Sequence, residues 1–245
     1  MAEKIFLTVI IPAYNEERHI KDTLYEISGY LKNRGFAYEI IIVDDGSIDR
    51  TAEIAQSTAP LFNNFVLLKN GNNRGKGYAV RRGMLAAKGE HALFMDADNS
   101  TSIYEFDKFL PCIKEGYDVV IASRRLKDSL VEDPQPMLRA KMGQLYIFLS
   151  RAILKLNLSD FNCGFKVYNV KSCRFIFDLQ RMDDWSFDVE LLFLINKYGL
   201  KIKEVPVRWV HKSGSKVKPI KDAVRSFLSI IKIKLNDLKN LYKVK

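Results

Sequence analysis

The strongest constraint on the fold is a repeated alternation of short apolar runs with segments of helical periodicity. The runs are rich in β-branched residues and lie at residues 5–11, 39–43, 65–68, 91–95 and 117–122. Runs of this kind are typical of strands that are buried on both faces. Their alternation with helices predicts an α/β fold, in which helices wrap a mostly parallel sheet through right-handed crossovers.

Polar clusters follow three of these predicted strands. They lie at residues 14–16, 44–45 and 96–98, and the last contains an Asp-x-Asp pair, Asp96 and Asp98. Because parallel strands end at one edge of a sheet, where ligands bind in open α/β folds, we expect the three clusters to converge. Two carboxylates one residue apart suit a divalent cation that keeps open positions for phosphate oxygens. An isolated Asp-x-Asp also occurs in solvated turns, so the convergence is what makes this pair a candidate site.

A glycine-containing loop at residues 72–79 opens a further predicted helix. It holds Arg74, Gly75, Lys76 and Gly77, and exposed backbone amides beside cationic side chains favour phosphate. The glycine spacing is neither that of a Walker loop nor that of the Gly-x-Gly-x-x-Gly dinucleotide motif. The sequence therefore predicts phosphate binding outside these two classes.

The second half of the chain is less regular. Residues 127–136 contain two prolines and predict a loop. Residues 139–158 predict a helix with apolar residues on more than one face, which suits either burial or partial contact with a membrane. Residues 160–166 lead into a strand, residues 185–198 form a helix that carries Asp188, and residues 202–210 are extended.

Positive charge is concentrated at the carboxyl end. The net charge is +10, and residues 212–245 hold ten lysines and arginines against two aspartates. From residue 219 the apolar residues recur at helical spacing with lysines between them, which is typical of an amphipathic helix at a membrane surface, although packing within the protein gives the same pattern. A basic tail also suits nucleic acid. The rest of the chain is nearly neutral and has no nucleic-acid-binding motif, so an anionic membrane is the expected partner and nucleic acid is not.

Two further observations concern the cellular compartment of the protein. No uncharged apolar run approaches the ~20 residues that span a bilayer, and the amino end has no signal-peptide pattern. The three cysteines lack metal-ligand spacing, which predicts reduced thiols. We expect a cytoplasmic protein that associates peripherally with the membrane.

Together these motifs resemble glycosyltransferase family 2, and within it the polyprenyl-phosphate (dolichyl-phosphate) sugar synthases. The matching stretches run in the expected order at residues 9–16, 43–47, 73–77, 96–98, 122–124, 160–166, 185–192 and 214–216. The Arg-Gly-Lys-Gly loop and the stretch from Trp185 to Leu192 are more similar to the glucosyl than to the mannosyl branch. The Gln-x-x-Arg-Trp signature of processive members is absent, so a polymerase is not expected.

The resemblance implies a GT-A fold, a Rossmann-like sheet that binds a nucleotide sugar. Residues 1–217 would form this domain, with a nucleotide-sugar-binding half at 1–122 and an acceptor-binding half at 123–217, and residues 218–245 would form the basic amphipathic tail. We see neither an amino-terminal membrane anchor nor a carboxyl-terminal multi-span domain. The tail and the 139–158 region are therefore the expected contacts with the membrane.

The resemblance also assigns site residues. Those implied for nucleotide-sugar binding are Pro12, Ala13, Tyr14, Glu16, Asp44, Asp45, Lys76, Asp96, Ala97 and Asp98. Asp45 could accept the N3–H of a uracil, and Asp96 and Asp98 would hold Mg²⁺ or Mn²⁺ against the diphosphate, with Asp98 as the more direct ligand. The cation offsets the charge that builds on the departing nucleoside diphosphate.

The chemistry of the acceptor determines which other residues are needed. A lipid monophosphate is already anionic near neutral pH and needs cations to position it rather than a general base. Arg124, Arg139 and Lys216 are the candidate cations, and Asp188 would orient the sugar or the acceptor unless it is only a helix-start carboxylate. With Asp98, these residues form the expected catalytic set.

The expected activity is that of an inverting hexosyltransferase acting on a polyprenyl or dolichyl phosphate at the cytoplasmic membrane face. UDP-glucose is the first expected donor. The alternatives are GDP-mannose as the donor and another glycan or lipid as the acceptor. A sugar-1-phosphate nucleotidyltransferase is disfavoured because its Gly-x-Gly-Thr-Arg loop is missing.

Overall fold

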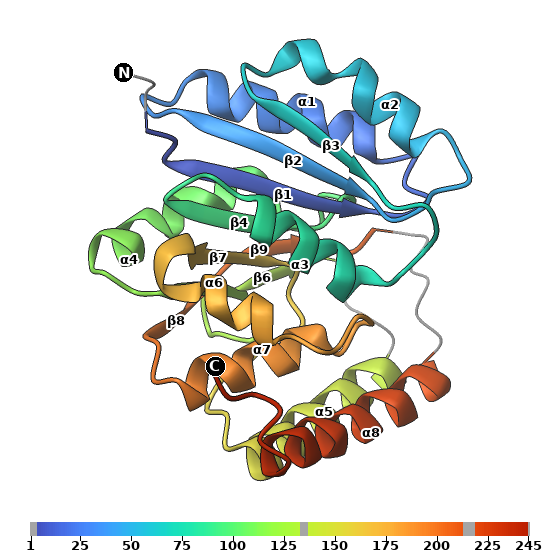
Figure 1. Ribbon diagram of the computed structural model, residues 1–245, viewed down its shortest axis with the longest axis vertical. Coiled ribbons are helices and arrows are strands. Elements are labelled where there is room, and N and C mark those ends of the chain that lie inside the picture. Colours follow the sequence, from blue (N-terminus) through green and yellow to red (C-terminus); the bar gives the residue numbers. More distant parts are fainter. Residues whose placement is uncertain (1–3, 133–136, 213–218, 245) are drawn as a thin grey trace.

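A seven-stranded sheet forms the centre of the molecule (Figure 1), in the order β3-β2-β1-β4-β7-β5-β8. The computed structural model describes residues 4–132, 137–212 and 219–244, and only the backbone of residues 137–141 and 219–225. The strands of the sheet are β1 (Leu7–Ala13), β2 (Tyr38–Asp44), β3 (Phe65–Lys69), β4 (His91–Met95), β5 (Val119–Ser123), β7 (Phe165–Asn169) and β8 (Ile202–Pro206). All neighbours pair in parallel except β7, which is antiparallel to both β4 and β5. The predicted α/β class with a mostly parallel sheet is confirmed.

Both faces of the sheet are buried, as the continuous apolar strands predict. In β1, Val9 and Ile11 enter one core while Ile10 enters the other, because side chains alternate along a strand. One core lies under α1 (Ile20–Lys32), α2 (Thr51–Ser57), α4 (Leu110–Lys114) and the 3₁₀ helix η2 (Ile103–Lys108). The other lies under α3 (Lys76–Ala86), α6 (Val170–Leu179) and α7 (Phe187–Lys197).

The first helix begins at Ile20, after a turn at residues 17–19. Other local features differ from the sequence-based expectations. The segment predicted as a loop contains a short exposed strand, β6 (Leu130–Glu132), which pairs in parallel with β9 (Arg208–Val210). Helix α6 was not predicted, and the antiparallel entry of β7 between β4 and β5 has no signal in hydropathy, which does not encode strand direction.

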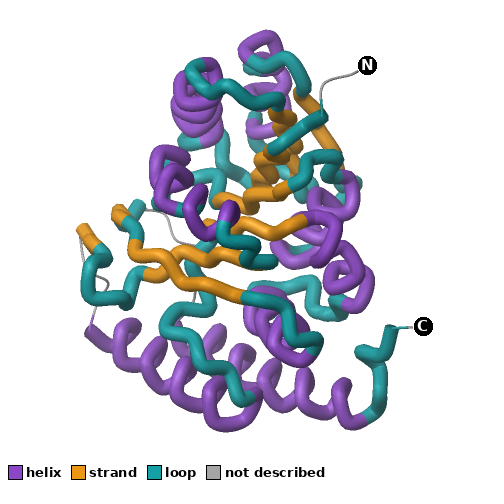
Figure 2. The backbone as a smooth tube through the Cα atoms, turned by 90° about the vertical axis from the view of Figure 1, so that its left-hand side faces the viewer, coloured by secondary structure: helices purple, strands orange, loops and turns teal. Residues whose placement is uncertain are grey.

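Two long helices form a separate layer at one end of the molecule. Figures 1 and 2 show α5 (Met137–Leu154) and α8 (Pro219–Leu238) side by side, at the opposite end from α1 and α2. Ile230 and Ile233 of α8 are buried in the core, so part of this helix packs within the protein. None of the described helices is both long enough and apolar enough to cross a bilayer.

Candidate active site

The polar clusters after β1, β2 and β4 meet at one edge of the sheet, as predicted. Strands β2 and β4 both pair in parallel with β1, one on each side, so their carboxyl ends flank the end of β1. Pro12 and Ala13 end β1 opposite Val43 and Asp44. This arrangement follows from strand direction alone and brings together the first polar residues after each strand.

The loops after β1 and β2 are fastened to each other. Asn15 adopts a left-handed conformation, with φ of +53°, and its backbone N–H donates to Ser47 Oγ at 2.9 Å. The backbone N–H of Glu16 donates to Thr51 Oγ1 at 2.7 Å. Tyr14 and Glu16 are therefore held, partly exposed, beside the Asp44 turn.

Asp45 is almost fully buried and anchors the glycine-containing loop. Its Oδ1 accepts from the side-chain amide of Asn70 at 2.6 Å and from the backbone N–H of Arg74 at 3.0 Å. Its Oδ2 accepts from the backbone N–H of Gly75 at 2.8 Å. Asp45 thus ties β2 to the loop, while its predicted contact with a base stays a prediction.

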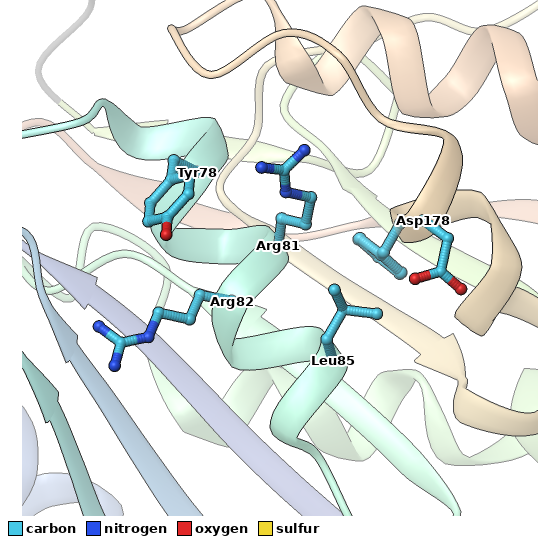
Figure 3. Close-up of a pocket in the computed structure, with 6 residues that line it drawn as sticks. Tyr78, Arg81, Arg82, Leu85 and Asp178 are labelled. Carbon is cyan, nitrogen blue, oxygen red and sulfur yellow. The ribbon is translucent and has the colours of Figure 1, made fainter. Parts of the chain in front are cut away.

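A second layer of contacts supports this anchor from α3. Figure 3 shows Arg81 and Arg82 extending in different directions from α3, at a cavity of about 320 Å³ that Tyr78, Leu85, Phe177 and Asp178 also line. Arg82 donates to the backbone carbonyl of Lys69 at 2.8 Å and to the side chain of Asn70, which in turn holds Asp45. Sequence reasoning did not identify Asn70 or Arg82, because nothing local marks them as partners of Asp45.

Lys76 lies within the carboxylate cluster. Its Nζ donates to Asp96 Oδ1 at 2.6 Å and lies 4.8 Å from the centre of the Trp185 ring. Burial acts to lower the pKa of Lys76, but the nearby carboxylates of Asp96, Asp188 and Asp98 outweigh it and raise that pKa. Lys76 is therefore a cation at the working pH, and it neutralises part of the charge of this cluster.

The surroundings of Asp98 oppose its ionisation. Burial, and then the negative charge of Asp96, raise the pKa of Asp98, although the backbone N–H of Ser100 donates to its Oδ1 at 2.9 Å. Asp96 lies directly over the Cα of Gly164, where an added Cβ would come within 2.0 Å of its Oδ2. Glycine at 164 therefore leaves the space that this carboxylate occupies.

The carboxylate oxygens of Asp96 and Asp98 fit a hard divalent cation that takes further ligands from a substrate. Asp96 and Asp98 offer carboxylate oxygens, which Mg²⁺ and Mn²⁺ prefer, and two negative charges in a partly buried place favour a cation there. No group of three or more acidic, histidine or cysteine side chains suited to a metal occurs among the residues that the structure describes. Two protein ligands leave coordination positions for diphosphate oxygens.

Asp188 is buried in an ion pair with Lys166. Lys166 Nζ donates to Asp188 Oδ1 and, at 2.8 Å, to the backbone carbonyl of Cys163. Burial raises the pKa of Asp188, and the positive charges of Lys166 and then Lys76 offset only part of that rise. Lys166 was missed by the sequence analysis, although a lysine between two apolar residues of a buried strand was an available signal.

Arg124 forms an ion pair with Asp160 inside the protein. Its Nε and Nη2 donate to the two carboxylate oxygens of Asp160 at 2.7 and 2.8 Å, and its backbone N–H donates to Oδ2 at 3.1 Å. Burial raises the pKa of Asp160, but the guanidinium outweighs burial and lowers that pKa to about 2. The side chain of Arg124 keeps 21% of its surface exposed, so one edge of it still faces solvent.

Two predicted acceptor cations lie beyond what can be described. Arg139 belongs to the first turn of α5, but its side chain is outside the described residues, and so is the whole of Lys216. Strand β9 lies beside the loop that carries Asp98, because the backbone N–H of Val210 donates to the carbonyl of Ser100 at 2.9 Å. Ala97, also predicted, is buried, and its carbonyl accepts from Thr23 Oγ1 at 2.8 Å.

Solved structures support the GT-A architecture. Mannosyl-3-phosphoglycerate synthase from Rubrobacter xylanophilus superposes with a TM-score of 0.71 and 16% identity, covering 98% of this chain and 77% of that one. Glucosyl-3-phosphoglycerate synthase from Mycobacterium tuberculosis, crystallised with Mn²⁺, UDP-glucose and phosphoglyceric acid, superposes with a TM-score of 0.68 and 18% identity, covering 95% of this chain and 79% of that one. At this identity the similarity establishes the fold alone.

Sequence comparison establishes the family. A dolichyl-phosphate beta-glucosyltransferase of Dictyostelium discoideum is 35% identical over 256 residues, which covers 99% of this chain and 78% of the relative. The Saccharomyces cerevisiae protein of the same name is 31% identical, over 98% of this chain and 78% of the relative. The human protein of that name is 30% identical, over 87% of this chain and 70% of the relative. Residues 8–177 match the family described as glycosyl transferase family 2. The match spans most of the chain, and the chain belongs to glycosyltransferase family 2.

Proposed function

We propose that this protein transfers glucose from UDP-glucose to a dolichyl-type polyprenyl phosphate, with inversion at the anomeric carbon. The observation that carries the proposal is the Asp96–Asp98 pair at the carboxyl edge of the sheet, in a chain whose relatives are named dolichyl-phosphate beta-glucosyltransferases. Those names support glucose over mannose, so the GDP-mannose alternative is not favoured.

On the donor side, the loops after β1 and β2 would hold the nucleoside and the carboxylate pair would hold the diphosphate through Mg²⁺ or Mn²⁺. Pro12, Ala13, Tyr14, Glu16, Asp44 and Asp45 would form the nucleoside side of the site. When bound, the cation would neutralise charge that develops on the leaving UDP. Lys76 supports the same role, because its ammonium lies 2.6 Å from Asp96 and stays charged.

On the acceptor side, a phosphate oxygen would attack C1 of glucose as the bond from C1 to the UDP oxygen breaks. The nucleophile is anionic, so the step transfers no proton to the enzyme. The protein needs cations at the acceptor, for which we retain Arg124, Arg139 and Lys216 as proposals, with Arg124 held in place by Asp160. Asp188 is proposed to orient bound substrate together with Lys76, whose positive charge acts to lower the pKa of Asp188. We also retain the proposed division into donor half 1–122, acceptor half 123–217 and tail 218–245.

The layer formed by α5 and α8 is the part that we propose to contact a membrane. Its exposed apolar side chains are Leu145 and Phe148 on α5 and Phe227, Leu228, Ile231, Leu235 and Leu238 on α8. Exposed cations such as Lys232 lie among them. Apolar residues interspersed with lysines suit the interface of an anionic bilayer, which fits peripheral attachment at the cytoplasmic face.

The test is transfer of radiolabelled sugar into the organic phase. Purified protein with dolichyl phosphate should give labelled lipid from UDP-glucose, while faster transfer from GDP-mannose would refute the assignment of glucose. Asp98→Ala should abolish transfer with the circular dichroism spectrum unchanged, and Asp22→Ala on the exposed surface of α1 is the matched control. Chelation should also stop transfer, and Mn²⁺ or Mg²⁺ should restore it; full activity in chelator would eliminate the metal.

A further inference from the structure

A second cavity, of about 350 Å³, lies between α5 and the segment that follows β5. Its lining consists of Arg125, Gln144, Ile147, Phe148, Arg151 and Ser159. None of these residues belongs to the donor site. Four of them come from α5, in the outer helical layer visible in Figures 1 and 2.

The cavity has two guanidinium groups and no lining carboxylate. Arg125 lies against α5, where a Cβ added to Gly143 would come within 3.3 Å of its Nη2. Its guanidinium makes no hydrogen bond or ion pair with the described parts of the chain. Arg151 uses its Nε to donate to the carbonyl of Leu158 at 2.7 Å, and this bond leaves its terminal nitrogens for other partners.

The carboxylates next to Ser159 are already engaged. Asp160, which follows Ser159, is paired with Arg124. Glu204 accepts from the backbone N–H and the hydroxyl of Ser159 at 2.9 and 2.6 Å. The positive charge of Arg125 and Arg151 therefore has no internal counterpart among the cavity's lining residues, and an arginine pair of this kind favours a phosphate, which guanidinium groups bind through paired hydrogen bonds.

The rest of the lining combines two polar residues, Gln144 and Ser159, with two apolar ones. Ile147 and Phe148 contribute hydrocarbon surface, and Phe148, with 66% of its surface exposed, continues toward Leu145, with 58% exposed. A free inorganic phosphate would leave this surface unused. A phosphate attached to a hydrocarbon chain would use both the cationic and the apolar parts, on the same helix that we propose to lie at the bilayer.

We propose that the Arg125–Arg151 cavity binds the phosphate group of a lipid. This inference rests on the proposed function, because it requires α5 to lie at a membrane. Two lipids carry the required chemistry, namely an anionic phospholipid of the bilayer and the polyprenyl phosphate acceptor itself. The cavity would fix the orientation of α5 at the bilayer in the first case and receive the acceptor in the second.

The experiment is sedimentation of the full chain with vesicles of phosphatidylcholine alone, with added phosphatidic acid, or with added polyprenyl phosphate. Arg125→Gln is the main variant, and Arg125→Lys keeps the charge but removes the planar fork. Lys232→Gln, on the exposed side of α8, is the control for a general loss of charge. Because one cation near an anionic surface contributes about 1 kcal/mol, that control should weaken binding about fivefold at most.

Arg125→Gln should weaken binding to one kind of anionic vesicle by more than about tenfold, with partial loss in Arg125→Lys. Loss with phosphatidic acid identifies the phospholipid, and loss only with polyprenyl phosphate identifies the acceptor. An effect equal to that of Lys232→Gln on every vesicle overturns the proposal. Glucose transfer by the unmodified protein is measured in parallel: its absence refutes the proposed function, whereas normal transfer with unselective binding refutes only the cavity's role.

Discussion

Replacing Asp160 with asparagine should destabilise the protein at neutral pH and reduce its sensitivity to acid. Asp160 is 1% exposed and accepts three hydrogen bonds from Arg124, which lower its pKa from 3.8 to about 2 against the opposing effect of burial. A pKa difference of this size between the unfolded and folded states corresponds to about 2.5 kcal/mol of folding free energy. Because the folded pKa is the lower one, that stabilisation is complete above the unfolded pKa and is lost as the pH falls toward the folded pKa.

The measurement is urea-induced unfolding of both proteins at several pH values. Above about pH 5 the variant should be less stable by about 2.5 kcal/mol, and near pH 3 the difference should fall to about half of that. Asp128→Asn, at an exposed position of the segment after β5, controls for a general change in charge. If the difference between the unmodified protein and Asp160→Asn stayed constant across this range, the ion pair would not be the source of the stability.

Two further substitutions test the geometry of the carboxylate cluster. Gly164→Ala places a Cβ where the carboxylate of Asp96 lies, so Mn²⁺ affinity measured by calorimetry should fall about tenfold or more; unchanged affinity would remove Asp96 from the metal site. Lys166→Met leaves Asp188 buried without its counter-charge and should cost about 3–5 kcal/mol in urea unfolding. The double variant Lys166→Met/Asp188→Leu should regain much of that stability, and failure to do so would mean that packing, not charge, was lost.

The location of the site was predictable because it depends on strand direction. Apolar runs that end in polar residues specify both the strands and their carboxyl ends, and parallel pairing places these ends at one edge of the sheet. Asp45, Asp96 and Asp98 follow β2 and β4 and so reach one edge without any knowledge of side-chain packing.

The interaction partners of individual side chains were not predictable in this way. Arg124 was expected to be available for an acceptor, yet it pairs with Asp160, 36 residues later in the chain. Lys166 meets Asp188 only because β7 enters the sheet antiparallel to β4. Such pairs depend on the three-dimensional path of the chain, which neither periodicity nor motif spacing encodes.

The carboxyl-terminal segment is linked to the candidate donor site through the loop of residues 181–186. Tyr242 is buried, and its hydroxyl donates to Glu190 Oε1 at 2.6 Å. Glu190 also accepts from the backbone N–H of Met182 at 2.8 Å, and the carbonyl of Met182 lies where a Cβ on Gly77 would approach within 2.6 Å. The residue before Gly77 is Lys76, which pairs with the carboxylate cluster. Because Tyr242, Glu190, Met182 and Gly77 are all buried in this series, we expect a displacement of the chain end from Glu190 to disturb the loop that we propose holds the donor's diphosphate. The apolar layer that we assign to the bilayer and the site that we assign to the sugar nucleotide therefore share one continuous scaffold.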